Sequence, residues 1–162
     1  MDYSRLTNLN NIEHKDITGT YLEQIATWHN QTPKIWVPNF QASREDIEKD
    51  IQRIQQTNPK DLFLGIAVDT THTLQGFIWA YKQEKPEDSV MILSLYTSKT
   101  HRKKGHATQL KLLLEAWCKD EGIKTIETTV HYTNSKMLEL NKKLGYTAGM
   151  VSMRKTLEWA IQ

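Results

Sequence analysis

The fold of this chain is decided by the stretch Leu93-Ser94-Leu95-Tyr96-Thr97-Ser98-Lys99-Thr100-His101-Arg102-Lys103-Lys104-Gly105-His106-Ala107-Thr108. Its first part continues an apolar run from Val90 and is typical of a buried strand. A basic turn follows, and a glycine opens the next helix. That helix keeps Leu110, Leu114 and Trp117 on one face and ends at Gly122, a residue type that closes helices in the left-handed conformation.

The turn between this strand and this helix is suited to bind phosphate. The first amides of a helix have no partner within it, and the helix dipole favours negative charge there. Gly105 and Ala107 are small enough to let a ligand approach these amides. No Asp or Glu occurs between Asp88 and Glu115, whereas this interval contains Lys99, Arg102, Lys103, Lys104 and Lys111. The alternative is that Gly105 only eases a tight turn and that the lysines are solvated.

Upstream of this stretch, the pattern predicts two helices followed by two strands. Apolar residues recur at helical spacing from Tyr21 to Trp28, and the chain breaks at Pro33 and Pro38. The second helix has Ser43 as its N-cap, with Ile47, Ile51 and Ile54 on one face, and stops before Asn58-Pro59. Leu62–Val68 and Gln75–Tyr81 then read as a hairpin.

Downstream, alternation from Ile126 to Val130 predicts another strand. A helix capped by Asn134 or Thr133 follows and ends at Gly145, and 146–157 is expected to supply one or two closing strands. The order of elements predicts an α/β fold with a mixed, mostly antiparallel central sheet flanked by about four helices. We find no linker or repeat and expect a single domain over residues 1–162.

Composition excludes several classes of protein. The chain has 162 residues, 38% hydrophobic and 25% charged, which is the balance of a globular domain. Its single cysteine, Cys118, cannot form an internal disulfide or a four-ligand zinc site, and we expect no metal. The formal net charge of +2 is too small to indicate nucleic acid as a partner. The N-terminus lacks the apolar core of a signal peptide, and no apolar run could span a membrane, so we expect a cytoplasmic protein.

Two motifs resemble those of a known family. Arg102-Lys103-Lys104-Gly105-His106-Ala107 resembles the Arg/Gln-x-x-Gly-x-Gly/Ala signature of the GNAT superfamily of acetyl-CoA-dependent N-acyltransferases. Asn134, followed by Leu140-Asn141-Lys142-Lys143-Leu144-Gly145-Tyr146, resembles the second signature of that family, an Asn capping a helix that ends in Lys-x-Gly-aromatic. Together the two motifs cover about residues 90–148 and lie on the expected elements.

The resemblance implies a function and a set of binding residues. It implies an N-acetyltransferase that moves an acetyl group from acetyl-CoA to a primary amine of a small molecule or peptide, by direct transfer in a ternary complex. The diphosphate of coenzyme A would meet the amides of the turn, its pantetheine arm would pair with the strand edge, and Asn134 and Asn141 would lie near the pantetheine and the sulfur. The residues implied in coenzyme binding are Leu95, Tyr96, Thr97, Arg102, Lys103, Lys104, Gly105, His106, Ala107, Thr108, Asn134 and Asn141.

The groups that would move protons depart from the family pattern. Many members have a Tyr as general acid where this chain has Asn141, and some have a Glu where it has Thr129. Glu127 and His131 lie two residues from Thr129 and would share its strand face. We take His131 as the hypothetical base because the imidazole of an unperturbed histidine titrates near neutral pH, with Glu127 as the other candidate. The alternative is that His131 is a polar residue at a strand end without a catalytic role. Tyr146 is a candidate proton donor to the thiolate, with packing as its alternative role.

The acceptor site is expected beside aromatic residues of the first half of the chain. Trp36 lies between two prolines and could wall a pocket or hold a cationic amine, and Trp28 and Tyr81 are the other candidates. The competing function is a non-catalytic acyl-CoA-binding sensor or interaction module, because both familiar proton carriers are missing. The sequence is compatible with a monomer and with a homodimer.

Overall fold

The structure is a computed structural model that describes residues 1–9 and 16–160. It contains two compact units, Met1–Thr128 and Thr129–Gln162. Within the described residues, the four α-helices and the mixed five-stranded sheet confirm the predicted fold class.

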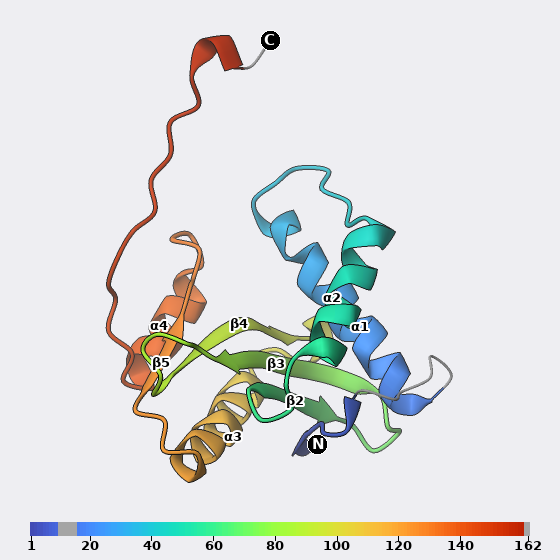
Figure 1. Cartoon of the computed structure of the whole chain (residues 1–162). Helices are drawn as coiled ribbons and strands as arrows, with labels where there is room; N and C mark the ends of the chain where they lie inside the picture. The colour runs from blue at the N-terminus through green and yellow to red at the C-terminus, as the bar shows by residue number, and fades with distance from the viewer. Residues whose placement is uncertain (10–15, 161–162) are drawn as a thin grey trace. The chain divides into compact units, whose positions relative to one another are not determined.

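The first unit is built on the five-stranded sheet, whose strands follow their order in the chain (Figure 1). The strands are β1 (Asp2–Arg5), β2 (Leu62–Val68), β3 (Leu74–Lys82), β4 (Ser89–Thr97) and β5 (Thr125–Thr128). Neighbours from β1 to β4 are antiparallel, while β4 and β5 run parallel. A parallel pair needs a crossover connection, and the helix between β4 and β5 supplies it.

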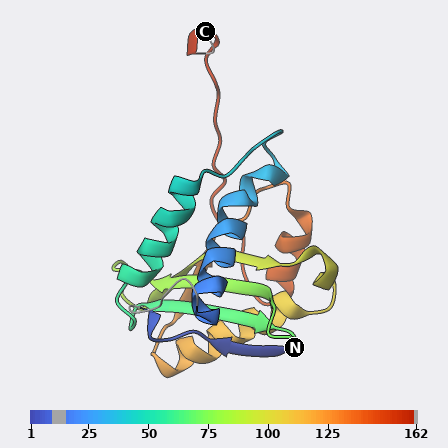
Figure 2. The same cartoon turned by 90° about the vertical axis from the view of Figure 1, so that its right-hand side faces the viewer.

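Helices cover both faces of this sheet. α1 (Ile17–Gln31) and α2 (Arg44–Gln56) lie on one face, and α3 (His106–Asp120) lies on the other (Figure 2). One core cluster joins Leu22 and Ile25 of α1 to Phe77 and Trp79 of β3. A second cluster joins α3 to the opposite side chains of the same strands. Each helix therefore buries the apolar stripe that its sequence predicts.

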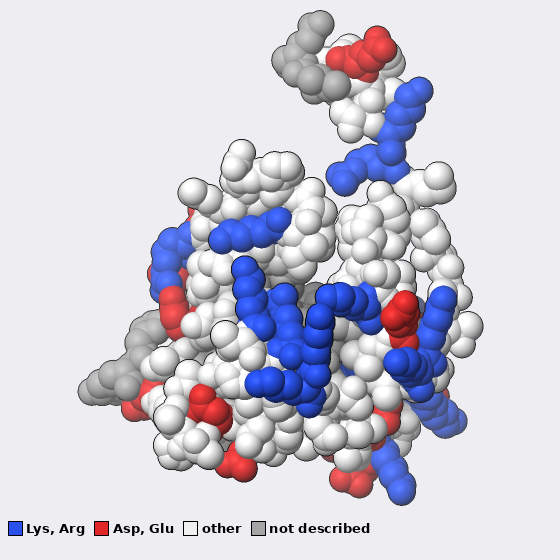
Figure 3. Space-filling model, turned by 180° about the vertical axis from the view of Figure 1, so that it is seen from behind, with Lys and Arg blue, Asp and Glu red and all other residues white. Residues whose placement is uncertain are grey.

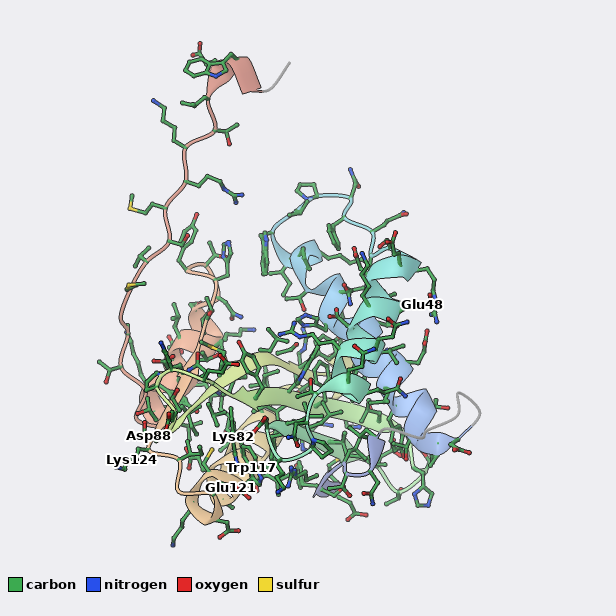
Figure 4. All side chains as sticks on the ribbon, viewed as in Figure 1. Glu48, Lys82, Asp88, Trp117, Glu121 and Lys124 are labelled. Carbon is green, nitrogen blue, oxygen red and sulfur yellow. The ribbon has the colours of Figure 1, made fainter. Side chains whose placement is uncertain are left out.

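The helix ends follow local chemistry. Ser43 caps α2, since its hydroxyl accepts a 3.1 Å hydrogen bond from the amide of Asp46. At the other face, the C-terminal end of α3 is tied to the sheet by a 2.8 Å ion pair between Lys82 and Glu121, and the Lys82 ammonium lies 5.4 Å from the centre of a Trp117 ring (Figure 4). These contacts therefore hold the C-terminal end of α3 against β3.

A bulge divides β4 into two parts. Ser94 pairs with Trp79 and Ile92 pairs with Ala80, so Leu93 is left without a partner on β3. β5 pairs with β4 only from Ser89 to Ile92. The predicted strand over 126–130 is thus wrong at its far end, because among the described residues the pairing of β5 with β4 ends at Thr128 opposite Ile92.

The N-terminal strand β1 was not predicted from the sequence. Its four residues pair with the outer edge of β2, from Asp2 opposite Val68 to Arg5 opposite Gly65. A run this short carries too little alternation to be recognised in the sequence.

The second unit contains α4 (Ser135–Lys143) and no strand within its described residues. Asn134 is its N-cap and accepts a 3.2 Å hydrogen bond from the amide of Met137, while Gly145 follows the helix at φ +92°. The closing strands expected over 146–157 are absent, so that prediction is wrong. Apolar spacing alone does not make a strand, because the backbone also needs a partner, and no described strand pairs with this segment.

Among the described residues, no helix is both long enough and apolar enough to cross a bilayer.

Candidate functional site

The first feature of the site is an open strand edge in the first unit. Residues 94–97 of β4 pair with β3 on one side. On the other side, the pairing with β5 ends at Ile92, so no described strand of this unit continues the ladder along Leu93–Thr97. Backbone N–H and C=O groups on such an edge can take up an extended ligand as if it were an added strand.

Hydrogen bonds to β3 and to the end of β4 hold the turn after β4 in place. The amide of Ser98 donates to the carbonyl of Gln75 at 2.8 Å, and its hydroxyl donates to the side chain of Gln75 at 2.7 Å. Arg102 donates from Nε to the carbonyl of Thr97 at 3.0 Å, and its guanidinium lies 5.2 Å from the Tyr96 ring centre. Arg102 therefore fixes the turn to the end of β4, a structural role that the sequence did not indicate.

The turn leads into the exposed amides at the start of α3. Gly105 is the N-cap at φ +85°, and no side chain caps the helix. A Cβ at Gly105 would meet nothing within 4 Å, so this position requires glycine for its left-handed backbone and not for space. The amides of the first turn are therefore available to an anion, at the end of the helix that attracts negative charge.

The charge around the turn is positive. Lys99, Lys103 and Lys104 are exposed. In Figure 3, several Lys and Arg side chains lie close together near the middle of the view, with few acidic groups among them, and other Lys and Arg side chains lie elsewhere on the same face. This surface would attract a polyanion by long-range electrostatics.

Two histidines flank Gly105. The ring of His106 is hydrogen-bonded through Nδ1 to the hydroxyl of Tyr3, and its centre lies 6.1 Å from that of His101. Burial lowers the pKa of His106, and the neighbouring His101 and Lys104 lower it further. His106 is therefore neutral at neutral pH and joins β1 to the start of α3.

The residues predicted to bind the coenzyme fall in both units. Those from Leu95 to Thr108 lie together on β4, the turn and the start of α3, all in the first unit. Asn134 and Asn141 lie in the second unit, where Asn134 caps α4. Asn141 is buried, and its Oδ1 has no hydrogen-bond partner among the described residues.

The predicted proton carriers do not share a strand face. Glu127 lies on β5 and accepts a 2.8 Å hydrogen bond from Gln83, whereas His131 lies beyond the strand, in the second unit. Nδ1 of His131 accepts a 3.2 Å hydrogen bond from the amide of Thr133. Tyr146 follows α4 and donates its amide to the carbonyl of Asn141 at 2.8 Å.

The predicted acceptor residues differ in their surroundings. Trp28 of α1 stacks at 6.4 Å on Phe77 and at 4.7 Å on Tyr96, which places it over β3 and β4. Tyr81 lies under the guanidinium of Arg53, at 5.8 Å. Trp36 follows the 3-10 helix η2 (Thr32–Ile35) and is 43% exposed. Trp28 and Tyr81 thus belong to the sheet face covered by α1 and α2.

A further polar group on this face was missed. His29 of α1 lies between Trp79 of β3, at 5.2 Å between ring centres, and Asp50 of α2, with Nε2 4.0 Å from Oδ2. Its Nδ1 is buried and has no hydrogen-bond partner among the described residues. The sequence held no signal for this arrangement, because His29 and Asp50 come from different helices.

Other reactive groups are not placed for chemistry. The described residues include no cluster of three or more His, Cys, Asp or Glu side chains that could hold a metal ion. Cys118 is buried in the α3 core, and burial raises the pKa of its thiol to about 11. Since a thiolate is the nucleophilic form, Cys118 is inert at neutral pH.

Comparison with known proteins extends these observations. A protein from Staphylococcus aureus named as a GNAT family acetyltransferase is 27% identical, with a TM-score of 0.62 over 78% of this chain and 98% of that one. The aminoglycoside N-acetyltransferase AAC(6')-Iy, in complex with the bisubstrate analogue CoA-S-monomethyl-acetylneamine, is 17% identical, with a TM-score of 0.65 over 96% of this chain and 98% of that one. An aminoglycoside acetyltransferase from an uncultured soil sample is 16% identical, with a TM-score of 0.65 over 97% and 98%.

A comparison with curated protein sequences finds no match. The profile of the acetyltransferase (GNAT) family, in contrast, matches residues 22–146, which include the open β4 edge, the glycine turn and α4. This chain therefore belongs to the acetyltransferase (GNAT) family.

Proposed function

We propose that this protein is an N-acetyltransferase that moves an acetyl group from acetyl-CoA to a primary amine by direct transfer in a ternary complex. The observation that carries the proposal is the open edge of β4 at Leu93–Thr97, which leads through a braced turn to the uncapped start of α3. Pantetheine is an extended chain with two amides, and it suits the edge. The diphosphate of the same molecule suits the amides at and after Gly105.

Two findings support a direct reaction within one domain. The ligand of AAC(6')-Iy is a bisubstrate analogue, so that protein holds coenzyme and acceptor portions at the same time. The family match runs from 22 to 146 and thus includes parts of both compact units, which supports a single domain over residues 1–162.

The protein must assist three steps of this reaction. An alkyl amine with a pKa of about 10.4 must lose a proton to become a nucleophile. The nitrogen then attacks the thioester carbon, and an N–H group of the β4 edge near Leu95 would stabilise the oxyanion. The C–S bond breaks, and the thiolate of coenzyme A takes up a proton. No enzyme nucleophile is needed, because positioning two bound substrates supplies much of the rate.

Coenzyme binding is tested by calorimetric titration of coenzyme A into the purified chain. The decisive pair of variants is Gly105→Val and Gly122→Val, because both glycines have positive φ values and open space around them at opposite ends of α3. Both substitutions strain the backbone, but only Gly105→Val places bulk at the proposed diphosphate site. We expect Gly105→Val to weaken binding by about tenfold or more, or about 1.4 kcal/mol, with Gly122→Val close to wild type. Equal affinities would overturn the diphosphate site.

Turnover is tested separately, by release of free coenzyme A thiol from acetyl-CoA in the presence of a panel of small-molecule and peptide amines. Amine-dependent release identifies the acceptor class and supports the acetyltransferase. If the protein binds the coenzyme but releases no free thiol with any amine, the acetyltransferase proposal fails. The alternative function, a non-catalytic acyl-CoA-binding module, then takes its place.

A further inference from the structure

His29 has polar and charged neighbours at the place where α1 and α2 meet the sheet. It lies on α1, above Trp79 of β3 and beside α2, in the layer that Figure 1 shows over one face of the sheet. Its Nε2 is 4.0 Å from Oδ2 of Asp50, and the same oxygen accepts a 2.7 Å hydrogen bond from the side chain of Asn30. The carboxylate is thus fixed in place by α1 itself and faces one nitrogen of the imidazole.

This arrangement leaves the other nitrogen of His29 unpartnered. A carboxylate beside Nε2 favours the tautomer that carries its proton there, so the lone pair of the neutral ring lies on Nδ1. Nδ1 is buried and has no hydrogen-bond partner among the described residues. A buried acceptor without a partner is destabilising, and its presence beside a candidate site points to a group that a ligand or its water supplies.

The position of His29 relates it to the open strand edge. Trp79, the ring under His29, is the register partner of Ser94, which adjoins the bulge at Leu93. The preceding residue, Trp28, stacks on Tyr96 further along β4. His29 therefore lies on the face of the sheet that carries the side chains of Ser94 and Tyr96. It is near the point at which the pairing of β4 with β5 ends.

The surroundings of His29 keep the ring neutral. Burial lowers its pKa, the carboxylate of Asp50 opposes that effect, and the guanidinium of Arg53 adds to it. Arg53 and Asp50 are the charged groups of α2 that face the ring, and β3 contributes Trp79 and Tyr81, over which Arg53 lies. A neutral imidazole with an unused lone pair is the form that a general base requires.

We propose that His29, oriented by Asp50, is the base that receives the proton of the acceptor amine, directly or through one water, once a shift of the surrounding side chains exposes Nδ1 to the bound amine. The inference rests on the proposed acetyl transfer. As the amine nitrogen forms its bond to the thioester carbon, its proton passes to Nδ1 of His29, and Asp50 stabilises the resulting imidazolium. The C–S bond breaks, and the proton returns through solvent to the thiolate, so that the products are an amide and the free thiol.

The first test compares His29→Ala with wild type and with His72→Asn, a change at an exposed histidine of the β2–β3 turn. The readout is kcat/KM for the fastest amine of the panel, with coenzyme affinity measured alongside. We expect His29→Ala to lose about 10²- to 10⁴-fold in kcat/KM, the range for a general base, while coenzyme affinity and the His72→Asn variant stay near wild type. A loss of less than about tenfold would overturn the assignment.

The second test keeps the imidazole and changes its charge environment. Asp50→Asn preserves the shape of the side chain and a hydrogen-bond acceptor for Asn30. The proposal can therefore be tested with this variant even if His29→Ala does not fold. Since Asp50 raises the pKa of His29, its loss should move the acidic limb of the kcat/KM profile to lower pH. An acidic limb that stays in place would contradict the proposal. If wild type acetylates no amine, the proposed function fails as a whole; if wild type is active and both variants match it, only the role of His29 fails.

Discussion

Lys111 gives the most quantitative prediction, because it is a lysine buried within α3. Its side chain is 1% exposed, and burial lowers its pKa from 10.5 to about 8, although Glu115 one turn away opposes the shift. The unfolded chain therefore binds this proton more tightly than the folded chain. The gap between 10.5 and about 8 corresponds to about 3 kcal/mol, at about 1.4 kcal/mol per pKa unit.

The lowered pKa of Lys111 determines the pH range over which the free energy of unfolding changes. Above pH 10.5 the lysine is neutral in both states and imposes no cost. As the pH falls from 10.5 towards 8, the unfolded state takes up the proton first, so the folded state loses stability. Below pH 8 the cost is complete and constant. Wild type should thus gain about 3 kcal/mol over this range, relative to a variant without the amine.

The assay is urea unfolding of wild type, Lys111→Met and Lys119→Met at neutral pH and at several values up to 10.5. Lys119 is an exposed lysine of the same helix and is the matched control. Methionine keeps most of the buried length, so Lys111→Met should be most favourable relative to wild type at neutral pH and lose that advantage by pH 10.5. Tyrosine ionisation at high pH affects all three proteins and cancels in the differences. If the difference between wild type and Lys111→Met does not vary with pH, the reasoning is refuted.

Three further predictions concern stability. Ser43→Ala removes the N-cap of α2 and should cost about 1 kcal/mol in urea unfolding, with no effect expected from the neighbouring exposed change Gln41→Ala. Gly65→Ala places a Cβ 2.9 Å from Cγ2 of Ile78 and should cost about 1–3 kcal/mol, whereas Gly149→Ala, with nothing within 4 Å, should be neutral; equal melting temperatures would contradict this. The pKa values of His29 and His106 are lowered, so the unfolded chain takes up protons first, and the free energy of unfolding should decline as pH falls below about 6.5. A variant with both residues changed to Gln should show a shallower decline.

Much of the first unit could be predicted because local and tertiary signals agree. Ser43 followed by isoleucines at helical spacing predicts α2, and the structure realises both the cap and the buried stripe. The run from Leu62 to Val68 matches β2 at both ends. The element that sequence analysis missed, β1, has four residues and depends on the β2 edge for its existence. Its stability comes from pairing with a distant segment, which no local pattern encodes.

The same distinction, between features with a local sequence pattern and features formed by distant segments, applies to the candidate site. The proposed coenzyme side could be located in the sequence because it consists of backbone: a glycine at positive φ and a strand that loses its neighbour both leave a pattern in one contiguous segment. The proposed proton acceptor, His29, leaves no such local pattern in the sequence. His131 was chosen for its spacing from Thr129, but that spacing has meaning only on a strand, and β5 ends at Thr128. His29 and Asp50 come together only when α1 packs on α2.

In the proposed site, coenzyme binding and acceptor choice depend on different groups. Backbone groups would bind the coenzyme, so this binding would not depend on most side chains. The amine side has no such constraint, because the chemistry there needs only one lone pair at the correct place. The family resemblance implies a Tyr in many members at the position of Asn141 and a Glu in some at the position of Thr129; this chain has neither, and α1 presents a histidine above β3. A base supplied by α1 would leave the β4 edge unchanged while altering which amines can approach it, so acceptor choice and proton transfer would vary together through the packing of α1 on α2.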